Sequence, residues 1–174
     1  TLSFDPGETS KPVTVDVNDD TLDEDDETFF VNLSGATEAA ILDSQGVGTI
    51  ADDDPLPSLS IADLSFTEGF GVRRVSLMVT LGAKSGRPVT VDYVIGPGSA
   101  TPGTEFRAET GTLAFPPGET RRRLFVWTKG DRLDEANEDF VVDLQGAVNA
   151  TIATPQATET IVDDDPPPRS RTTP

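Results

Sequence analysis

The sequence predicts an all-β fold, an immunoglobulin-like antiparallel β-sandwich arranged as a tandem repeat. Apolar and polar residues alternate with a period of two, and Gly- and Pro-rich segments such as "GAKSGRP", "GPGSATPG" and "FPPGE" separate the alternating runs. No run has the 3.6-residue periodicity of an amphipathic helix. About seven short strands in roughly 110 residues are typical of an immunoglobulin-like sandwich.

The expected strands follow one another from Leu59 to the end of the repeat. Val75, Leu77 and Val79 alternate with more polar residues, and Phe140 and Val142 do so in a later run. Alternation of this kind places one set of side chains on the buried face of a sheet. We expect strands near 59–67, 72–82, 88–96, 111–115, 120–129, 138–145 and 150–162.

An internal repeat divides the chain unequally. The segment "TLSFDPGET" matches "TLAFPPGET", and "LDEDDETFFVNLSGA" matches "LDEANEDFVVDLQGA", with a constant separation of 111 residues that also aligns Phe4 with Phe115. Residues 58–165 are therefore predicted to be a complete unit, and residues 1–54 the C-terminal half of another. Residues 55–57 are a short linker and residues 166–174 a Pro-rich tail. We expect about three strands in the half unit, completed by upstream strands or another copy of the chain.

Composition restricts the function. The 174 residues carry a formal net charge of −18 and include no cysteine and no histidine. An acidic field repels nucleic acid and anionic lipid, and the missing residues exclude thiolate sites and Ser-His-Asp or Cys-His triads. No apolar stretch is long enough for direct membrane insertion. Because the sequence begins at Thr1, we expect a fragment or a processed product of a longer protein.

Carboxylates gather at the predicted strand ends. Three consecutive aspartates follow the last strand of each unit, at Asp52–Asp54 and at Asp163–Asp165. A second acidic group precedes the Phe-rich strand, and in the complete unit it is "GDRLDEANEDF". If the last two strands are antiparallel neighbours, the strand that starts near Glu138 and the one that ends at Asp163 place both groups at one pole. Crowded carboxylates protonate or bind a cation, and many oxygen ligands on flexible loops favour Ca²⁺ over Mg²⁺. Solvated acidic loops are the alternative.

These segments together resemble the Calx-beta domain. The resemblance lies in "FPPGET", in "DEANEDF" and in the terminal "DDD", and it covers the complete unit and the half unit. The family includes domains in the regulatory loop of sodium–calcium exchangers, in an integrin β subunit and in bacterial surface proteins. The resemblance implies an immunoglobulin-like sandwich whose distal loops bind a cluster of Ca²⁺ ions.

The resemblance also implies a set of ligands. In the complete unit they would be Glu68, Glu105, Asp131, Glu135, Glu138, Asp163, Asp164 and Asp165. In the half unit they would be Asp19, Asp20, Glu24, Glu27, Asp52, Asp53 and Asp54. Two positions depart from the family pattern, because Glu105 stands where Asp is common and Gly130 replaces an acidic residue. We therefore expect fewer or weaker ions in the complete unit.

Other chemistry receives less support. Glu135 and Glu138 could be cast as the carboxylate pair of a glycoside hydrolase, but the unit lacks the aromatic platforms of a sugar cleft, so we expect no enzyme. The "RRRL" segment at Arg121 alternates between two faces of a strand, which leaves a patch of at most two cations and argues against nucleic acid. Trp127 is interpreted as a packing or partner-facing residue.

The sequence thus predicts a calcium-binding structural or adhesive module of a larger extracellular or cell-surface protein, in which Ca²⁺ orders the acidic loops and rigidifies the repeat junction. The expected partners are neighbouring repeats, another copy that completes residues 1–54, and other surface proteins. Two alternatives stay open. One is a regulatory Ca²⁺ sensor like that of an exchanger, and the other is a metal-free protein-interaction domain.

Overall fold

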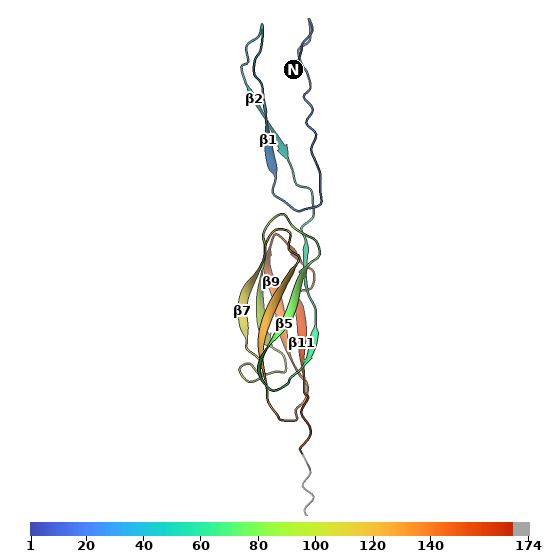
Figure 1. The fold of residues 1–174 in the computed structure, drawn as a ribbon, viewed down its shortest axis with the longest axis vertical. Helices are drawn as coiled ribbons and strands as arrows, with labels where there is room; N and C mark the ends of the chain where they lie inside the picture. The colour runs from blue at the N-terminus through green and yellow to red at the C-terminus, as the bar shows by residue number, and fades with distance from the viewer. Residues whose placement is uncertain (169–174) are drawn as a thin grey trace, which may run out of the picture. The chain divides into compact units, whose positions relative to one another are not determined.

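The computed structural model describes residues 1–168, which divide into two compact units. The first unit contains Thr1–Thr21 and Asp26–Ala51, and the second contains Leu22–Asp25 and the residues from Asp52 onward. Both units are built from β-strands (Figure 1). Within residues 1–168 no helix has the length and apolar character needed to cross a membrane.

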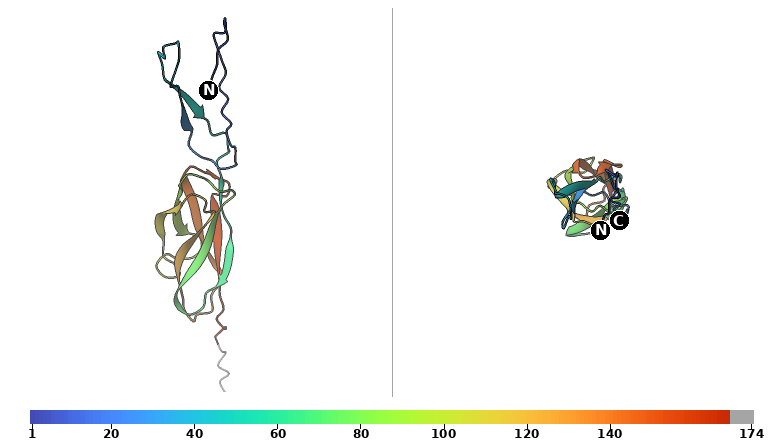
Figure 2. Two further views of the ribbon diagram at one scale, coloured as in Figure 1. Left: turned by 45° about the horizontal axis from the view of Figure 1, so that its top comes forward. Right: turned by 90° about the horizontal axis from the view of Figure 1, so that it is seen from above.

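The second unit is a sandwich of two sheets, as predicted (Figures 1 and 2). One sheet has the order β10 (Thr151–Ile152), β3 (Ser58–Ile61), β5 (Gly71–Leu81) and β8 (Arg121–Gly130). The other has the order β4 (Leu64–Thr67), β11 (Gln156–Val162), β9 (Glu138–Val148), β6 (Val89–Pro97) and β7 (Glu109–Phe115).

The core lies between the two sheets and is formed by the apolar residues of the alternating runs. On β5 and β8 the inward side chains include Leu77, Val79 and Val126, all with little or no exposed surface. Phe106 stacks on the fully buried Phe140 with ring centroids 4.9 Å apart. Burying a side chain of this size contributes about 1.5–3 kcal/mol to the stability of the fold. Because side chains alternate between the two faces of a strand, the apolar residues of the period-two pattern form the inner face of each sheet.

Two of the predicted strands are broken, and the prediction of single strands over 59–67 and 150–162 is wrong. In the first, β3 pairs with β5 whereas β4 pairs with β11, so the chain changes sheet between them. Asp63 stands at this crossing, where its carboxylate accepts a hydrogen bond from the Thr158 N–H at 2.8 Å. In the second, Pro155 separates β10 from β11 because proline has no N–H to donate to a ladder.

The first unit contains one antiparallel strand pair, β1 (Glu27–Asn32) and β2 (Gln45–Ile50). These strands are the equivalents, 111 residues earlier, of the first part of β9 and most of β11. The expected third strand is not formed in the described part of this unit. Its residues, 10–19, correspond to β8, which pairs with β5 in the complete repeat, and the half repeat has no equivalent of β5. Val13, Val15 and Val47 are consequently left exposed.

Candidate metal centre

The pairing of β4 with β11 brings the first two acidic segments together. These strands are parallel, and Thr67 lies beside Val162 at their ends. The next residues, Glu68 and Asp163, therefore leave the sheet side by side. The Glu68 N–H fixes this arrangement by donating a hydrogen bond to the Val162 carbonyl at 2.7 Å.

The acidic loop reaches the same pole from two other strands. β9 and β11 are antiparallel with Glu138 opposite Ile161, which confirms the predicted neighbours. The Asp163 N–H donates to the Asn137 side-chain oxygen at 3.1 Å and connects the aspartate triplet to this loop. Asp131 directly follows the last residue of β8, so the loop spans the gap between the two sheets.

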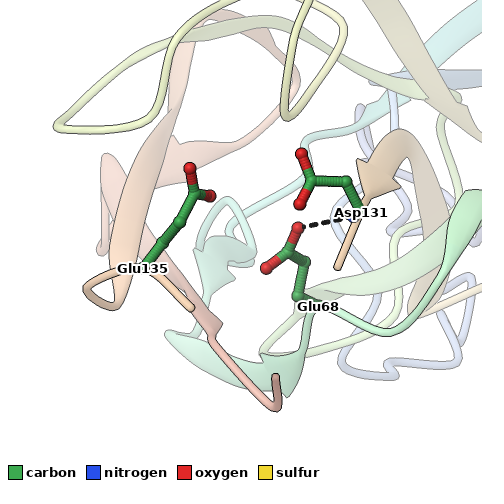
Figure 3. A group of neighbouring side chains, drawn as sticks. All are labelled: Glu68, Asp131 and Glu135. Carbon is green, nitrogen blue, oxygen red and sulfur yellow. Dashed lines mark hydrogen bonds between the residues drawn. The ribbon is translucent and has the colours of Figure 1, made fainter. Parts of the chain in front are cut away.

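Five carboxylates meet in two groups of three. One group is Glu68, Asp131 and Glu135, and the other is Glu68, Asp163 and Asp165. Within each group one oxygen of every residue lies within 4.8 Å of the others. Figure 3 shows the side chains of the first group converging, with the Asp131 N–H donating to Glu68 Oε1 at 2.9 Å. Glu68 belongs to both groups and is buried, which makes it the centre of the site.

The electrostatics of the site disfavour full ionisation. Burial raises the pKa of Glu68, and the charges of Asp131, Glu135 and Asp163 raise it further against the hydrogen bond from Asp131. Burial and then neighbouring carboxylates also raise the pKa of Glu135 and of Asp165. One oxygen of Asp165 is buried without a hydrogen-bond partner. A cation at this position would replace the missing partner and neutralise the crowded charges.

The other predicted ligands of the complete unit lie at the margin of the two groups. Burial raises the pKa of Glu138, as do the charges of Glu105 and then Glu135, so these carboxylates face the same region. The carboxylate of Glu105 accepts a hydrogen bond from the Thr101 N–H. Asp164 instead accepts one from the Gly69 N–H at 2.9 Å, which holds the aspartate triplet against the turn after β4.

The structure explains why position 130 is a glycine and not an acidic residue. A Cβ at this position would overlap with the Gly69 carbonyl and approach the Cγ of Glu68 to 2.9 Å. Gly69 and Gly71 have φ values of 67° and 82°, in the left-handed region that favours glycine. The turn between β4 and β5 can therefore press against the end of β8 only if residue 130 lacks a side chain. Glycine at position 130 therefore leaves the space in which the Glu68 side chain lies.

The predicted ligands of the half unit are distributed over both compact units. Asp19, Asp20 and Glu27 belong to the first unit, whereas Glu24 and Asp52–Asp54 belong to the second. In residues 1–168 no three of these carboxylates approach one another as closely as those around Glu68. The half unit has no counterparts of Glu68 and Glu105, which lie in the first half of the complete unit.

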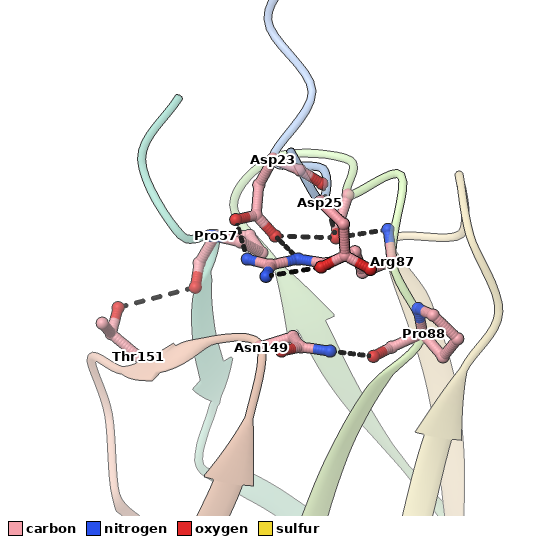
Figure 4. Close-up of polar contacts among 8 residues, drawn as sticks. Asp23, Asp25, Pro57, Arg87, Pro88, Asn149 and Thr151 are labelled. Carbon is pink, nitrogen blue, oxygen red and sulfur yellow. Dashed lines mark hydrogen bonds and ion pairs between the residues drawn. The ribbon is translucent and has the colours of Figure 1, made fainter. Parts of the chain in front are cut away.

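The sequence analysis did not identify Arg87 as the cation that pairs with Asp23 and Asp25. Within the second unit, Asp23 is only 2% exposed and accepts hydrogen bonds from Arg87 Nε at 3.1 Å and Ser85 Oγ at 3.0 Å (Figure 4). A second Arg87 nitrogen also contacts Asp23, and a third bonds Asp25 at 3.2 Å. The hydrogen bond with Asp23 is the main cause of a raised pKa of Arg87. No motif marks Arg87, which lies in the loop between β5 and β6.

Sequence comparison identifies relatives along nearly the whole chain. The family model of the Calx-beta domain matches residues 1–54 and 51–165. Sodium/calcium exchanger 1 of Rattus norvegicus is 30% identical over 166 residues, covering 83% of this chain and 17% of the exchanger. Sodium/calcium exchanger 3 of Mus musculus is 29% identical over 171 residues, covering 84% and 18%. The chain thus spans about a sixth of the length of these relatives.

Comparison with solved structures also finds Calx domains. The crystal structure of the apo-form Calx CBD1 domain is 26% identical with a TM-score of 0.57, covering 64% of this chain and 100% of that domain. The crystal structure of calcium binding domain CBD12 of CALX1.1 is 27% identical with a TM-score of 0.57, covering 62% and 46%. The sandwich described above is therefore shared with domains named for calcium binding.

Proposed function

Because this chain belongs to the Calx-beta family, we propose that its complete repeat is a regulatory Ca²⁺-sensing module, with the ion bound between the acidic loops of the pole. The observation that carries this proposal is the pair of carboxylate groups that share the buried Glu68. Their residues lie in the turns and loops next to the ends of β4, β8, β9 and β11, so ions bound by the two groups would connect segments from both sheets.

The donor set favours Ca²⁺ among biological cations. Every candidate side chain offers oxygen, and the chain has no histidine or cysteine to hold zinc or copper. Ca²⁺ takes six to eight oxygens in flexible geometry, which suits five clustered carboxylates with Glu105, Glu138 and Asp164 beside them. Mg²⁺ requires a tighter octahedron and keeps its waters, so it should bind more weakly.

The comparisons support one of the sequence-based hypotheses more than another. The relatives carry the names of sodium/calcium exchangers and calcium-binding domains, which favours the regulatory sensor over the extracellular adhesive module that we expected. The names give no support to an extracellular location. We propose that the chain is a non-catalytic part of a longer protein, and that neighbouring repeats or another copy complete residues 1–54.

Ion binding would act as a switch on loop order. In the metal-free state, repulsion among Glu68, Asp131 and Asp163 opposes closure of the acidic loops. A bound ion replaces that repulsion with attraction and stabilises the folded state by RT ln(1 + [L]/Kd), about 2.7 kcal/mol when free Ca²⁺ is 100 times Kd. A sensor-type site responds at 10⁻⁷–10⁻⁵ M Ca²⁺, whereas an extracellular-type site needs roughly 10⁻⁴–10⁻³ M.

Calorimetric titration with Ca²⁺ after chelator treatment tests the proposal. Glu68→Gln keeps the shape and the acceptor for the Asp131 N–H but removes the shared charge, so we expect at least a tenfold loss of affinity. Asp134→Asn is the matched control, because Asp134 lies in the same acidic loop but outside both carboxylate groups. Equal losses of Ca²⁺ affinity in the two variants would show that the ion responds only to the overall negative charge of the loops and not to a site around Glu68. A wild-type chain that gives no heat at millimolar Ca²⁺ would instead be a metal-free interaction domain.

A further inference from the structure

One outer face of the sandwich has a charge opposite to that of the whole chain. On β5 and β8 the side chains that point away from the core form what we call the basic–aromatic face. Its residues are Val72, Arg74, Ser76, Met78 and Thr80 on β5, and Arg121, Arg123, Phe125, Trp127 and Lys129 on β8. These ten residues include four cations and no carboxylate, although the chain carries a net charge of −18. The charge on the molecule is therefore segregated.

Arg74 is held at the centre of this face by two aromatic rings. It lies opposite Trp127 in the register of β5 with β8, and its guanidinium carbon is 4.1 Å from the centroid of the Phe125 ring and 5.3 Å from that of Trp127. Cation–π contacts of this kind orient a guanidinium without neutralising it. In residues 1–168 the ion pairs to carboxylates do not include any of the four cations of the face.

The aromatic residues of the face are open to solvent. Phe125 and Trp127 are each 41% exposed, and Val72 is 67% exposed. Tryptophan and arginine are enriched at the centres of protein interfaces, where rigid rings supply contact area at small entropic cost. An exposed apolar strip with cations on both sides thus has the composition of a binding surface.

A hollow next to Trp127 extends the face toward the metal centre. It has a volume of about 490 Å³, and its apolar walls include Val72, Pro102 and Phe106. Lys129 also lines the hollow, as does Arg107, whose Nε lies 4.0 Å from the Glu109 carboxylate. The space admits an apolar side chain of a ligand, while the neighbouring cations can pair with carboxylates on either side of that side chain.

We propose that the basic–aromatic face binds an extended acidic segment of a partner protein, with one apolar side chain in the hollow beside Trp127 and flanking carboxylates at Arg74 and Lys129. A short segment gains these contacts with only one end near the acidic pole, which begins at Asp131, two residues after Lys129. Long polyanions such as nucleic acid, and a second copy with the same net charge, would extend into that repulsive field. The proposal is independent of metal binding.

The fluorescence of Trp127 provides the test, because this residue is the only tryptophan of the chain. The probe is a five-residue peptide with a central phenylalanine and two glutamates on each side, titrated in EDTA at physiological salt. We expect a saturable blue shift of the emission. Arg74→Glu and Lys129→Glu should each weaken binding at least tenfold, and replacing the phenylalanine of the peptide by glutamate should weaken it at least fivefold.

Lys84→Glu is the matched control, because it makes the same charge change at an exposed loop residue beyond the opposite end of β5. It should leave the peptide affinity unchanged, and circular dichroism should show that all the variants are folded. A missing blue shift would overturn the proposal, as would equal weakening by Lys84→Glu. Tighter binding of a heparin oligosaccharide, a short DNA duplex or anionic vesicles would also overturn it, as would self-association in sedimentation.

Discussion

The complete repeat and the half repeat share one sequence register but form different structures. Residues 121–130 form β8, whereas residues 10–19, which align with them and alternate equally well in "KPVTVDV", form no strand. β8 is paired with β5 along ten residues, and the half repeat contains no equivalent of β5. Alternation therefore permits a strand, but a partner strand decides whether it forms.

The acidic residues show the same difference. The half repeat has the denser acidic segment, from Asp19 to Glu27, yet in residues 1–168 the close groups of three carboxylates occur only in the complete repeat. Glu68, on the turn after β4, supplies the shared member of both groups. Carboxylate density alone does not build a metal centre, because the ends of several strands must deliver the ligands to one point.

The largest effect is expected when one residue of the half repeat is placed in the complete repeat. Gly130→Asp introduces the residue found at the equivalent Asp19, and its Cβ would overlap with the Gly69 carbonyl. We expect a loss of at least about 3 kcal/mol in the free energy of unfolding, measured with urea in EDTA. Asp19→Gly is the reciprocal control and should change stability by less than about 0.5 kcal/mol. Normal stability of Gly130→Asp with tighter Ca²⁺ binding would contradict this explanation of the glycine.

A second difference between the two repeats lies at a core position of β11. Glu159 on β11 has no exposed surface, whereas the equivalent residue of the half repeat is Gly48, against which the Phe29 ring packs. Burial and the charge of Asp63 raise the pKa of Glu159 from 4.5 to about 7. The Leu64 N–H offsets this rise only in part, and neither oxygen of Glu159 has a hydrogen-bond partner by geometry.

The consequence for stability has a definite sign. Between pH 4.5 and pH 7 the folded chain holds a proton that the unfolded chain releases, so the contribution of Glu159 to stability falls as pH rises through this window. Glu159→Met removes the titration and should increase the free energy of unfolding by about 2–3 kcal/mol at pH 8 but little at pH 4. Glu159→Gln should remove the pH dependence while keeping a buried polar group. A gain that does not change with pH would show that Glu159 is not the titrating group.

A smaller effect is expected from competition between protons and Ca²⁺. The pKa values of Glu68, Glu135 and Glu138 are raised by burial and then by the charges of neighbouring carboxylates, so their protonated fraction grows as pH falls toward 5. Calcium must displace those protons. The stabilisation of the folded state by saturating Ca²⁺, about 1–3 kcal/mol at pH 7.5, and the rise in melting temperature that reports it should therefore shrink at pH 5. Without metal, the same raised pKa values make stability fall as pH increases. Melting curves in EDTA and in Ca²⁺ at the two pH values check both signs.

The smallest expected effect is local. Arg87→Met removes the cation that bonds the buried Asp23, and the Gly86 N–H donates to the Asp23 carbonyl at 2.9 Å. Hydrogen exchange of the Gly86 amide should become about tenfold faster, a change of about 1.4 kcal/mol in local opening, with little change in the global melting temperature. Lys84→Met, three residues before Arg87 in the same loop, should leave the Gly86 amide unaffected. An unchanged Gly86 rate in Arg87→Met would show that the arginine does not hold the segment.

Local patterns predicted the elements better than their partners. Alternation located the strands from β5 to β9, and the last two strands were predicted to be antiparallel neighbours. The breaks at Asp63 and Pro155 were missed, because the change of sheet depends on cross-strand hydrogen bonds that do not show in a single segment. The arginine segment was interpreted as a patch of two cations at most. Register with β5 adds Arg74 to the same face.

The candidate site was predicted in part for a similar reason. The acidic triplet and the acidic loop are visible in the sequence, and the resemblance to Calx-beta domains adds Glu68 and Glu105 to them. The burial of Glu68 and its membership of both carboxylate groups depend on the turn through Gly69, which passes over Gly130. Such a contact between distant glycines has no signature in local composition.

The parallel pairing of β4 with β11 also affects how the repeat would respond to pulling. These strands lie near the beginning and the end of the complete repeat, so tension applied through its two ends would act along them in opposite directions. All the hydrogen bonds between Leu64 and Thr67 and their partners on β11 would then be loaded in shear at the same time, instead of opening one by one. Glu68 and Asp163 directly follow the last pair of this ladder, so an ion bound by both would cross-link the ends of β4 and β11 and raise the force needed to separate them.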